Sequence, residues 1–487
     1  MSTITAISTP PGSGGIAVIR LSGPDAFAIA DMVWRGVRLA DAKSHSAHLG
    51  RIIDSDGSEL DHAVATIFRA PNSFTGEDTV EFSVHGSQWI QRRLVQLLCS
   101  LGADPADRGE FTRRAFLNGR LDLAQAEAVA DVIASSSRAA HRLAVTQMSG
   151  EFSSRLDGLR ERLVKLASLL ELELDFSEEE VEFADRSQLV RLTDEAIAYI
   201  ERLTSTYEAG RAIKNGVPVA IAGAPNAGKS TLLNRLLNEE KAIVSDIPGT
   251  TRDIIEDTCE IDGILFRFFD TAGLRDTDDV VESIGIDRAH QAIDRAQIVL
   301  WLLDGSDPLK KNIFKGIREQ IAAHPDSTHM LLFTKADLYV RSEERRVESE
   351  LEELETGIGK LVCEELKTGF VSKDYAGVEA EEHVKLIEIS AKTGEGIEDL
   401  EKELAVIARR GIDTQSEVII TNARHQAALT SGADSLRRAR SGISGGLSAD
   451  FIAQDIREAL HHIGLVTGRI TTPDLLTSIF TSFCVGK

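Results

Sequence analysis

Several kinds of residue are scarce in this sequence, and each scarcity excludes a class of protein. There are only 4 cysteines in 487 residues, widely spaced and never in a CxxC pair. Such spacing supplies neither a zinc site nor a disulfide framework, and it fits a reducing compartment. The longest apolar run, near IVLWLL, is far shorter than the roughly 20 residues that cross a bilayer, and the N-terminus MSTITAISTP lacks a signal-peptide pattern. We therefore expect a cytoplasmic protein with no membrane partner.

Basic residues are also in deficit. The chain has 54 lysines and arginines against 77 aspartates and glutamates, for a net charge of −23. Phosphate contacts with nucleic acid require clustered lysine and arginine, so charge alone will not hold an RNA. Any RNA contact is expected to be local or to be shared with a partner. The alternative interpretation is that the excess of aspartate and glutamate improves the solubility of the protein.

The sequence changes in character along its length, and 487 residues are too many for one core. Residues 1–119 hold short β-rich runs (IAVIR, AVATIF, TVEFSV) and one helix-like segment, SQWIQRRLVQLLCSL, which predicts a small α+β domain. Residues 120–215, as in LDLAQAEAVADVIASSSRAAHRLAVTQM, have the apolar spacing of long bundle helices. In residues 216–410, β-runs alternate with helices, which is typical of a doubly wound parallel sheet. Helical periodicity returns in residues 411–487, which end in FCVGK.

A helical pattern before and after the α/β segment predicts that the α/β domain is inserted into one helical domain. The predicted fold class is therefore multidomain, α+β and α/β. It combines an N-terminal α+β domain, a discontinuous α-helical domain and an inserted domain with a doubly wound sheet. The charge-rich stretch 341–383, beginning RSEERRVESELEELE, is predicted to be a solvated helical insertion.

The motif GAPNAGKS follows the strand-like VPVAIA and precedes the helix-like TLLNRLLN. It is GxxxxGK[ST] in the strand–loop–helix setting that a phosphate-binding loop requires. Backbone N–H groups surround the phosphates, Lys229 reaches the β and γ oxygens, and Ser230 offers its hydroxyl to Mg²⁺. This P-loop predicts a nucleotide-binding domain.

Two further motifs complete the expected phosphate and magnesium contacts. Asp270 ends the hydrophobic strand ILFRFFD, where a magnesium-associated carboxylate is expected. Gly273 can give its N–H to the γ-phosphate. Between these motifs and the P-loop lies GTTRD, in which Thr251 is the candidate for the second magnesium hydroxyl.

TKAD at 334–337 is similar to the guanine-reading NKxD motif of GTPases. Asp337 would take the two N–H donors on the guanine edge, and Lys335 would pack along the base. The first position is Thr334 rather than Asn, which weakens one supporting hydrogen bond but leaves the discriminating carboxylate. SAK at 390–392 supplies the last GTPase element. Motifs in this order favour GTP over ATP and predict a Ras-like G domain and a GTP hydrolase.

The residues expected to contact the nucleotide and its ions belong to these motifs. They are Asn226, Ala227, Gly228, Lys229, Ser230, Thr231, Ser245, Asp246, Ile247, Pro248, Gly249, Thr250, Thr251, Asp270, Thr271, Ala272, Gly273, Thr334, Lys335, Asp337, Ser390, Ala391 and Lys392.

Leu274 of DTAGL raises a difficulty for hydrolysis. Ras-type enzymes place Gln at this position to orient the attacking water, whereas a leucine side chain cannot hold water. Asn226 in the P-loop, followed by SDIPGTT, resembles the potassium-activated GTPases of the TRAFAC class. That resemblance implies a K⁺ ion that does the electrostatic work of an arginine finger. Its ligands would be Asn226, Ser245, Ile247 and Thr250.

Longer motifs carry a resemblance along the whole chain except 341–383. TPPGSGGIAVIRLSG, NSFTGEDTVEFSVHG, GEFTRRAFLNGRLDLAQAEAVADVI and FCVGK are similar to the MnmE (TrmE) family of tRNA-modification GTPases. In that family the G domains dimerise across the nucleotide when K⁺ is bound, and a glutamate after DTAGL acts on the water. Glu282 lies at the matching place, although read alone it would be a surface carboxylate. The catalytic residues that the resemblance implies are Glu282 and Lys229.

The resemblance also implies a folate-binding-like N-terminal domain that dimerises. Its contacts with 5-formyl- or methylene-tetrahydrofolate would be Arg20, Glu81, Arg120 and Lys487. In TVEFSV, Val80, Phe82 and Val84 share one face of a strand. Glu81 is therefore on the other face, where it can accept the N–H donors of the pterin, and the arginines suit folate carboxylates. Cys484 is either a reactive thiol or a small packed residue.

Finally, the resemblance implies a two-protein enzyme. The homodimer would join an FAD-containing MnmG (GidA) partner in a heterotetramer. This complex installs an aminomethyl or carboxymethylaminomethyl group at C5 of the wobble uridine, U34, of certain tRNAs. Folate supplies the one-carbon unit, while the flavin belongs to the partner and not to this chain. GTP hydrolysis would gate the chemistry through movement of the paired G domains.

Two alternatives remain at this stage. One is a ribosome-assembly GTPase of the Era or Der kind, although this chain has one P-loop and ends in acidic and mixed helices. The other is a folate enzyme in which the G domain is merely regulatory.

Overall fold

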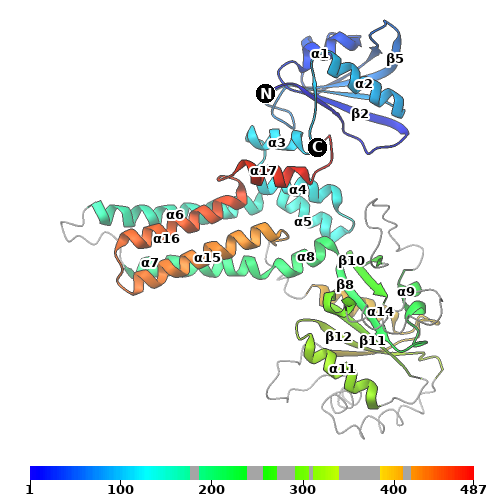
Figure 1. The fold of residues 1–487 in the computed structure, drawn as a ribbon, viewed down its shortest axis with the longest axis vertical. Helices are drawn as coiled ribbons and strands as arrows, with labels where there is room; N and C mark the ends of the chain where they lie inside the picture. The colour runs from blue at the N-terminus through cyan, green and yellow to red at the C-terminus, as the bar shows by residue number, and fades with distance from the viewer. Residues whose placement is uncertain are drawn as a thin grey trace. The chain divides into compact units, whose positions relative to one another are not determined.

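The computed structural model describes residues 1–175, 186–237, 256–270, 291–305, 311–338, 384–409 and 418–486. The chain folds as two compact units (Figure 1). Unit 1 comprises Met1–Ala134, Ala144–Thr204 and Ala423–Lys487, and unit 2 comprises Ser135–Leu143 and Ser205–Asn422. Within the described ranges, no helix has both the length and the apolar content that crossing a membrane requires.

Unit 1 begins with a seven-stranded sheet in the order β3-β4-β5-β6-β2-β1-β7. Its strands are β1 (Ile4–Ile7), β2 (Gly14–Ser22), β3 (Trp34–Arg35), β4 (Ser46–Ile53), β5 (Glu59–Phe68), β6 (Thr79–Gly86) and β7 (Asp104–Pro105). The helices α1 (Ala26–Val33) and α2 (Gln88–Ser100) pack on one face and share its core. Along β6, Val80 and Phe82 are fully buried in that core. Glu81, between them, therefore lies on the opposite face.

This domain contains more helix than the sequence predicted. Besides α2, it has α1 and α3 (Glu110–Leu117), so the expectation of one helix-like segment is wrong. The eight residues of α1, AFAIADMV, are almost uniformly apolar and show no helical period that would separate them from a strand. The sequence of α3, EFTRRAFL, mixes polar with apolar residues and shows no clean apolar face. Ion pairs bury Glu110 and Arg114, whereas Phe111 packs against Ile4 and Ala6.

The remainder of unit 1 is helical. Its helices are α4 (Leu123–Ala134), α6 (Glu151–Asp175), α7 (Arg186–Ser205), α15 (Ala423–Ser444), α16 (Ala449–Thr467) and α17 (Pro473–Thr481). In Figure 1, α6, α7, α15 and α16 run alongside one another as a bundle. Small residues such as Gly432, Ala439 and Ala459 let α15 and α16 pack closely. Helices from both sides of the α/β segment share this bundle, so the predicted insertion is confirmed.

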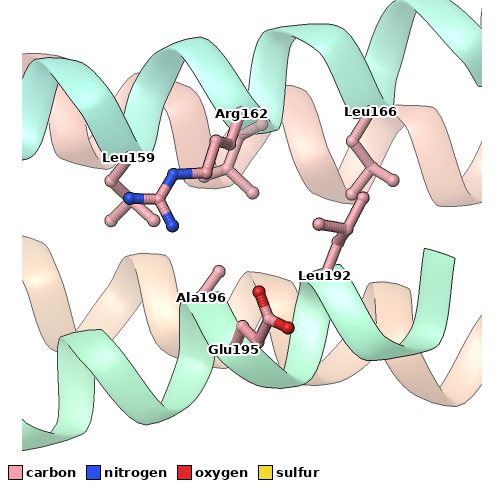
Figure 2. Close-up of a pocket in the computed structure, with 7 residues that line it drawn as sticks. Leu159, Arg162, Leu166, Leu192, Glu195 and Ala196 are labelled. Carbon is pink, nitrogen blue, oxygen red and sulfur yellow. The ribbon is translucent and has the colours of Figure 1, made fainter. Parts of the chain in front are cut away.

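A leucine-lined gap separates α6 from α7. Figure 2 shows Leu159 and Leu166 on α6 facing Leu192 and Ala196 on α7. The enclosed space is about 10 Å³. That volume is enough for roughly one water molecule, so this gap is a packing defect rather than a ligand site.

The predicted long bundle helices are interrupted after Ala134. Three serines follow. Serine hydroxyls can bond nearby backbone groups, which weakens a helix interior. The next helix, α5 (Arg138–Met148), starts beyond them, with the Ser137 hydroxyl accepting the Ala140 N–H at 3.2 Å. The expectation of continuous helix through ASSSR is therefore wrong, and Ser135–Leu143 belongs to unit 2.

Unit 2 is built on a six-stranded sheet in the order β13-β12-β11-β8-β10-β9. The strands are β8 (Val217–Gly223), β9 (Glu256–Ile261), β10 (Ile264–Asp270), β11 (Ile298–Asp304), β12 (Thr328–Thr334) and β13 (Val384–Glu388). Its helices include α8 (Tyr207–Asn215), α9 (Lys229–Leu236), α11 (Lys311–Ala323) and α14 (Ile397–Ala408). Every strand pair is parallel except β9 with β10 at the edge.

Apolar clusters cover both faces of this sheet, as expected when helices pack on each side. The predicted fold class is confirmed, with one antiparallel edge strand added. The carboxyl ends of β8, β10, β11 and β12 lie at one edge of the sheet. In such sheets this edge is where ligands bind.

Candidate functional site

The P-loop connects the end of β8 to the start of α9. At Gly223 an added Cβ would lie 2.6 Å from the Leu302 carbonyl oxygen, so only glycine lets β8 and β11 approach this closely. Asn226 and Gly228 both have left-handed backbones, with φ of 65° and 94°. A turn of this kind directs successive N–H groups toward a common point, where an anion can bind. α9 has no side-chain cap at its N-terminus, so its first N–H groups suit a phosphate.

The polar side chains of the P-loop lie at its surface. The Lys229 ammonium donates to the carbonyl oxygens of Gly223 at 2.6 Å and Ala224 at 3.2 Å, which holds it against the loop. Ser230 and Thr231 are exposed in the first turn of α9. This places a lysine and a hydroxyl at the same end of one helix, as phosphate and magnesium binding require.

The TKAD and SAK segments meet at the neighbouring carboxyl ends of β12 and β13. The Ser390 hydroxyl donates to Oδ1 of Asp337 at 2.7 Å and accepts the Thr393 N–H at 3.2 Å. Ser390 is fully buried, whereas Asp337 is exposed. A buried hydroxyl therefore fixes a carboxylate whose other oxygen remains available to a ligand. The Lys335 ammonium forms an ion pair with Asp304 at the end of β11, which directs its aliphatic stem.

Thr334 links this region to the P-loop. Its hydroxyl is buried and donates to the Ala227 carbonyl oxygen at 2.8 Å, with the Leu303 carbonyl oxygen at 3.2 Å. The departure from Asn at this position therefore keeps a hydrogen bond between the two loops. The structure thus brings together the P-loop residues, Thr334, Lys335, Asp337 and Ser390, with Ala391 and Lys392 in the turn that follows Ser390.

Several predicted site residues lie outside the described residues. They are Ser245, Asp246, Ile247, Pro248, Gly249, Thr250, Thr251, Thr271, Ala272, Gly273, Glu282 and Lys487, together with Leu274, the side chain of Asp270 and the 341–383 insertion.

Two of the predicted folate residues lie on the face of the N-terminal sheet opposite α1 and α2. Arg20 and Glu81 are cross-strand neighbours on β2 and β6. The Arg20 Nε and Nη2 atoms both lie 2.8 Å from Oε1 of Glu81. The Arg20 guanidinium also lies over two aromatic rings, 5.4 Å from the centroid of Phe74 and 5.3 Å from that of Phe111. Stacked and ion-paired, Arg20 is held in one position.

Arg120 and the chain up to Gly486 contact the same domain. An added Cβ on Gly76 would be 3.1 Å from Cγ of Arg120, so the Arg120 stem runs along the 72–79 loop. The chain before Lys487 docks beside β1, because the Ser8 hydroxyl donates to the Gly486 carbonyl oxygen at 3.2 Å. Next to it, the Gly109 N–H donates to the Cys484 carbonyl oxygen at 3.3 Å. The Cys484 side chain is exposed, so the alternative of a packed residue is wrong.

Two family models cover nearly all of this chain. The model described as "GTP-binding protein TrmE N-terminus" matches residues 3–120, and the model described as "MnmE helical domain" matches residues 123–484. The tRNA modification GTPase MnmE of Flavobacterium johnsoniae is 46% identical over 490 residues, with 100% of this chain and 99% of that protein covered. The protein of the same name from Parabacteroides distasonis is 46% identical, with 100% of both covered.

The chain belongs to the MnmE family. This membership confirms the prediction of a GTP hydrolase. Among solved structures, Era in complex with MgGDPNP and nucleotides 1506–1542 of 16S ribosomal RNA is similar with a TM-score of 0.28 and 22% identity. The match covers 45% of this chain and 65% of that one. The Ras-like fold of the G domain rests on its own strand order rather than on such a match.

The MnmE motifs contain buried charged residues that sequence reasoning did not single out. Arg114, almost fully buried, donates to Oε1 of Glu110 at 2.8 Å, to Oε2 of Glu77 at 3.2 Å and to the Ser2 carbonyl oxygen at 2.6 Å. These contacts join α3, the 72–79 loop and the start of the chain. The same helix carries Phe111, whose ring lies near Arg20. The sequence does contain a signal for these buried charges. In GEFTRRAFLNGR and NSFTGEDTVEF, charged residues stand among apolar ones.

A second, largely buried cluster of charged residues joins α4 to α15 and α16. Arg424 donates to both oxygens of Glu127, at 3.0 and 2.7 Å, and to the Leu465 carbonyl oxygen at 2.5 Å. The His425 Nε2 atom lies 2.8 Å from Oε2 of Glu127. Burial alone would raise the pKa of Glu127, but hydrogen bonds and charge from His425 and Arg424 outweigh it and lower that pKa to about 2. Glu127 therefore stays ionised in the helical domain of this MnmE-family chain.

Proposed function

We propose that this chain is the GTP-hydrolysing component of a complex that modifies C5 of the wobble uridine of tRNA. It would act in the cytoplasm as a homodimer, in a heterotetramer with an FAD-containing MnmG (GidA)-type partner. The group added at U34 would be aminomethyl or carboxymethylaminomethyl. The observation that carries this proposal is the full-length identity of 46% with proteins named tRNA modification GTPases. The same full-length match favours it over an Era- or Der-type ribosome-assembly role.

Nucleotide recognition would use the loops at the carboxyl edge of the unit 2 sheet. Asp337, oriented by Ser390, would accept the N–H donors of guanine. Lys229 would leave the Gly223 and Ala224 carbonyls and bind the β- and γ-phosphates. Ser230, exposed beside the left-handed turn, fits a magnesium ligand. Mg²⁺ would supply charge neutralisation at the phosphate oxygens, with Thr251 and Asp270 completing its protein contacts and Gly273 donating to the γ-phosphate.

Hydrolysis would not depend on Leu274. We assign the positioning of the attacking water to Glu282, after two G domains meet. Asn226 is exposed in the P-loop turn, which fits a side-chain oxygen ligand for a monovalent cation. Its partners would be Ser245, Ile247 and Thr250. K⁺ would supply the positive charge that an arginine finger provides elsewhere.

The N-terminal domain would bind a 5-formyl- or methylene-tetrahydrofolate through Arg20, Glu81, Arg120 and Lys487. The donor set fits: Arg20 holds only Oε1 of Glu81, and among the described residues no protein donor reaches Oε2. That oxygen can accept N–H groups of a pterin. Folate would supply a one-carbon unit, and the flavin would reside on the partner.

Deletion of the gene should remove the wobble-uridine modification while ribosome profiles stay normal. The measurement is nucleoside analysis of total tRNA by mass spectrometry. Re-expressing the wild-type chain should restore the modified nucleoside, and a Lys229→Ala variant should fail to do so. A Lys229→Ala chain that restores modification fully would contradict the GTP-driven proposal. Intact modification with defective ribosomal subunits would instead favour the ribosome-assembly alternative.

Potassium should accelerate GTP turnover of the purified chain by about tenfold or more relative to sodium, because the cation compensates transition-state charge. Turnover is measured as phosphate release in KCl and in NaCl at equal ionic strength. The Asn226→Ala variant should turn over slowly in both salts while still binding GDP. Equal wild-type rates in the two salts would remove the potassium site from the proposal.

A further inference from the structure

Phe74 is an exposed aromatic side chain on a segment that is otherwise anchored. It is 36% exposed, whereas its neighbours Ser73 and Thr75 are 7% and 0% exposed. The Ser73 hydroxyl donates to the Glu77 carbonyl oxygen at 2.6 Å, and the hydroxyls of Thr75 and Ser22 lie 2.8 Å apart. The backbone of Phe74 is therefore fixed before any ligand arrives, and little ordering entropy remains to be lost on binding.

A fixed charge and a carboxylate oxygen lie beside this ring. The Arg20 guanidinium is 5.4 Å from the Phe74 centroid and is paired with Oε1 of Glu81. Phe111, the other ring near Arg20, is fully buried and has no face to offer a ligand. Among the described residues, Oε2 of Glu81 receives no protein donor. Arg20 covers one side of the Phe74 ring. Phe74 and Glu81 thus offer the remaining exposed part of an aromatic ring and a hydrogen-bond acceptor around one arginine.

This combination fits a flat conjugated ring that carries N–H donors on one edge. Such a ring can stack on an aromatic face while its edge donates to a carboxylate. We propose that Phe74 is the stacking residue for the pterin ring and determines the specificity of the N-terminal site for pterins. The inference rests on the proposed folate site and adds to it a residue that selects the bicyclic ring rather than the glutamate tail.

The test is isothermal titration of 5-formyltetrahydrofolate into the full-length chain and three variants. Phe74→Tyr keeps an aromatic face and should bind within about threefold of the wild type. Phe74→Leu keeps apolar cover over Arg20 but removes the face, so its dissociation constant should rise by about three- to tenfold. Its far-ultraviolet circular dichroism at the titration temperature should match the wild type, which shows that the variant is folded. Glu81→Gln should weaken binding independently of Phe74.

Ligand fragments make the test specific. The loss in Phe74→Leu should appear with 6-hydroxymethylpterin and be absent with p-aminobenzoylglutamate. One outcome is that Phe74→Leu binds as the wild type does while Glu81→Gln loses affinity. That result would support the folate site and overturn the role of Phe74. If Phe74→Tyr loses as much as Phe74→Leu, the stacking role is also overturned. If the wild type itself binds no tetrahydrofolate, the folate site falls and this inference falls with it.

Discussion

We expect the Asp337→Asn variant to lose GTP affinity by about a thousandfold, because two hydrogen bonds to a charged acceptor are worth roughly 2 kcal/mol each. Asp337 is exposed and held by the buried Ser390 hydroxyl, so its carboxylate is positioned before the base arrives. An asparagine amide would place an N–H₂ group against a guanine donor. Xanthine carries a carbonyl at that position, so the variant should bind xanthosine triphosphate more tightly than the wild type does.

The measurement is competition of GTP and xanthosine triphosphate against a fluorescent nucleotide. Asp326 provides a matched control, because it is exposed in the same unit but precedes β12, whereas Asp337 follows that strand. Asp326→Asn should leave both affinities unchanged. Wild-type GTP affinity in Asp337→Asn would show that TKAD does not read the base.

Glu127→Ala should lower the free energy of unfolding of unit 1 by about 3–5 kcal/mol, the usual cost of removing one partner from a buried ion pair. The buried His425 and the partly buried Arg424 would then lack their shared carboxylate. Urea unfolding, followed by circular dichroism, measures the change. The exposed pair of Arg469 with Asp157 is the control, and Asp157→Ala should cost only about 0.2–1 kcal/mol. Similar losses in both variants would show that burial adds nothing at Glu127.

The contribution of Glu127 should also depend on pH in a defined direction. Its pKa in the folded chain is about 2, below the ordinary value of 4.5. The stabilisation is therefore fully present above the ordinary pKa and is lost as the pH falls through that value toward the folded pKa. The stability difference between the wild type and Glu127→Gln should shrink from pH 5 toward pH 2. A difference that stays constant over this range would contradict the assigned ionisation.

Local sequence patterns correctly predicted those elements whose structure is determined by a short stretch of residues. The P-loop lies between β8 and α9 as its motif requires, and the alternation in TVEFSV gives β6 with Glu81 facing away from the core. The pattern failed where local signals are ambiguous. The apolar α1 has no readable period, and the serines after Ala134 end a helix that the surrounding spacing would continue.

The sequence alone could not predict which charged residues, far apart along the chain, form ion pairs in the fold. Glu127 and Arg424 are 297 residues apart, and no local pattern connects them. The basic run RRAR shows the same limit. In the fold, Arg437 pairs with Glu201, Arg438 with Asp455 and Arg440 with Asp194. These arginines join helices, so a basic run in the sequence does not amount to a basic surface.

The docking of Gly486 beside β1 has a consequence for how the chain is made. Ser8 and Gly486 are 478 residues apart. At about 5–20 residues per second, a ribosome needs roughly 25 to 95 seconds to synthesise the chain between them. The N-terminal sheet can form early in that interval, but its β1 end must wait for Cys484–Gly486. A nascent chain therefore completes the surroundings of its N-terminal site only after the whole of unit 2 has been translated.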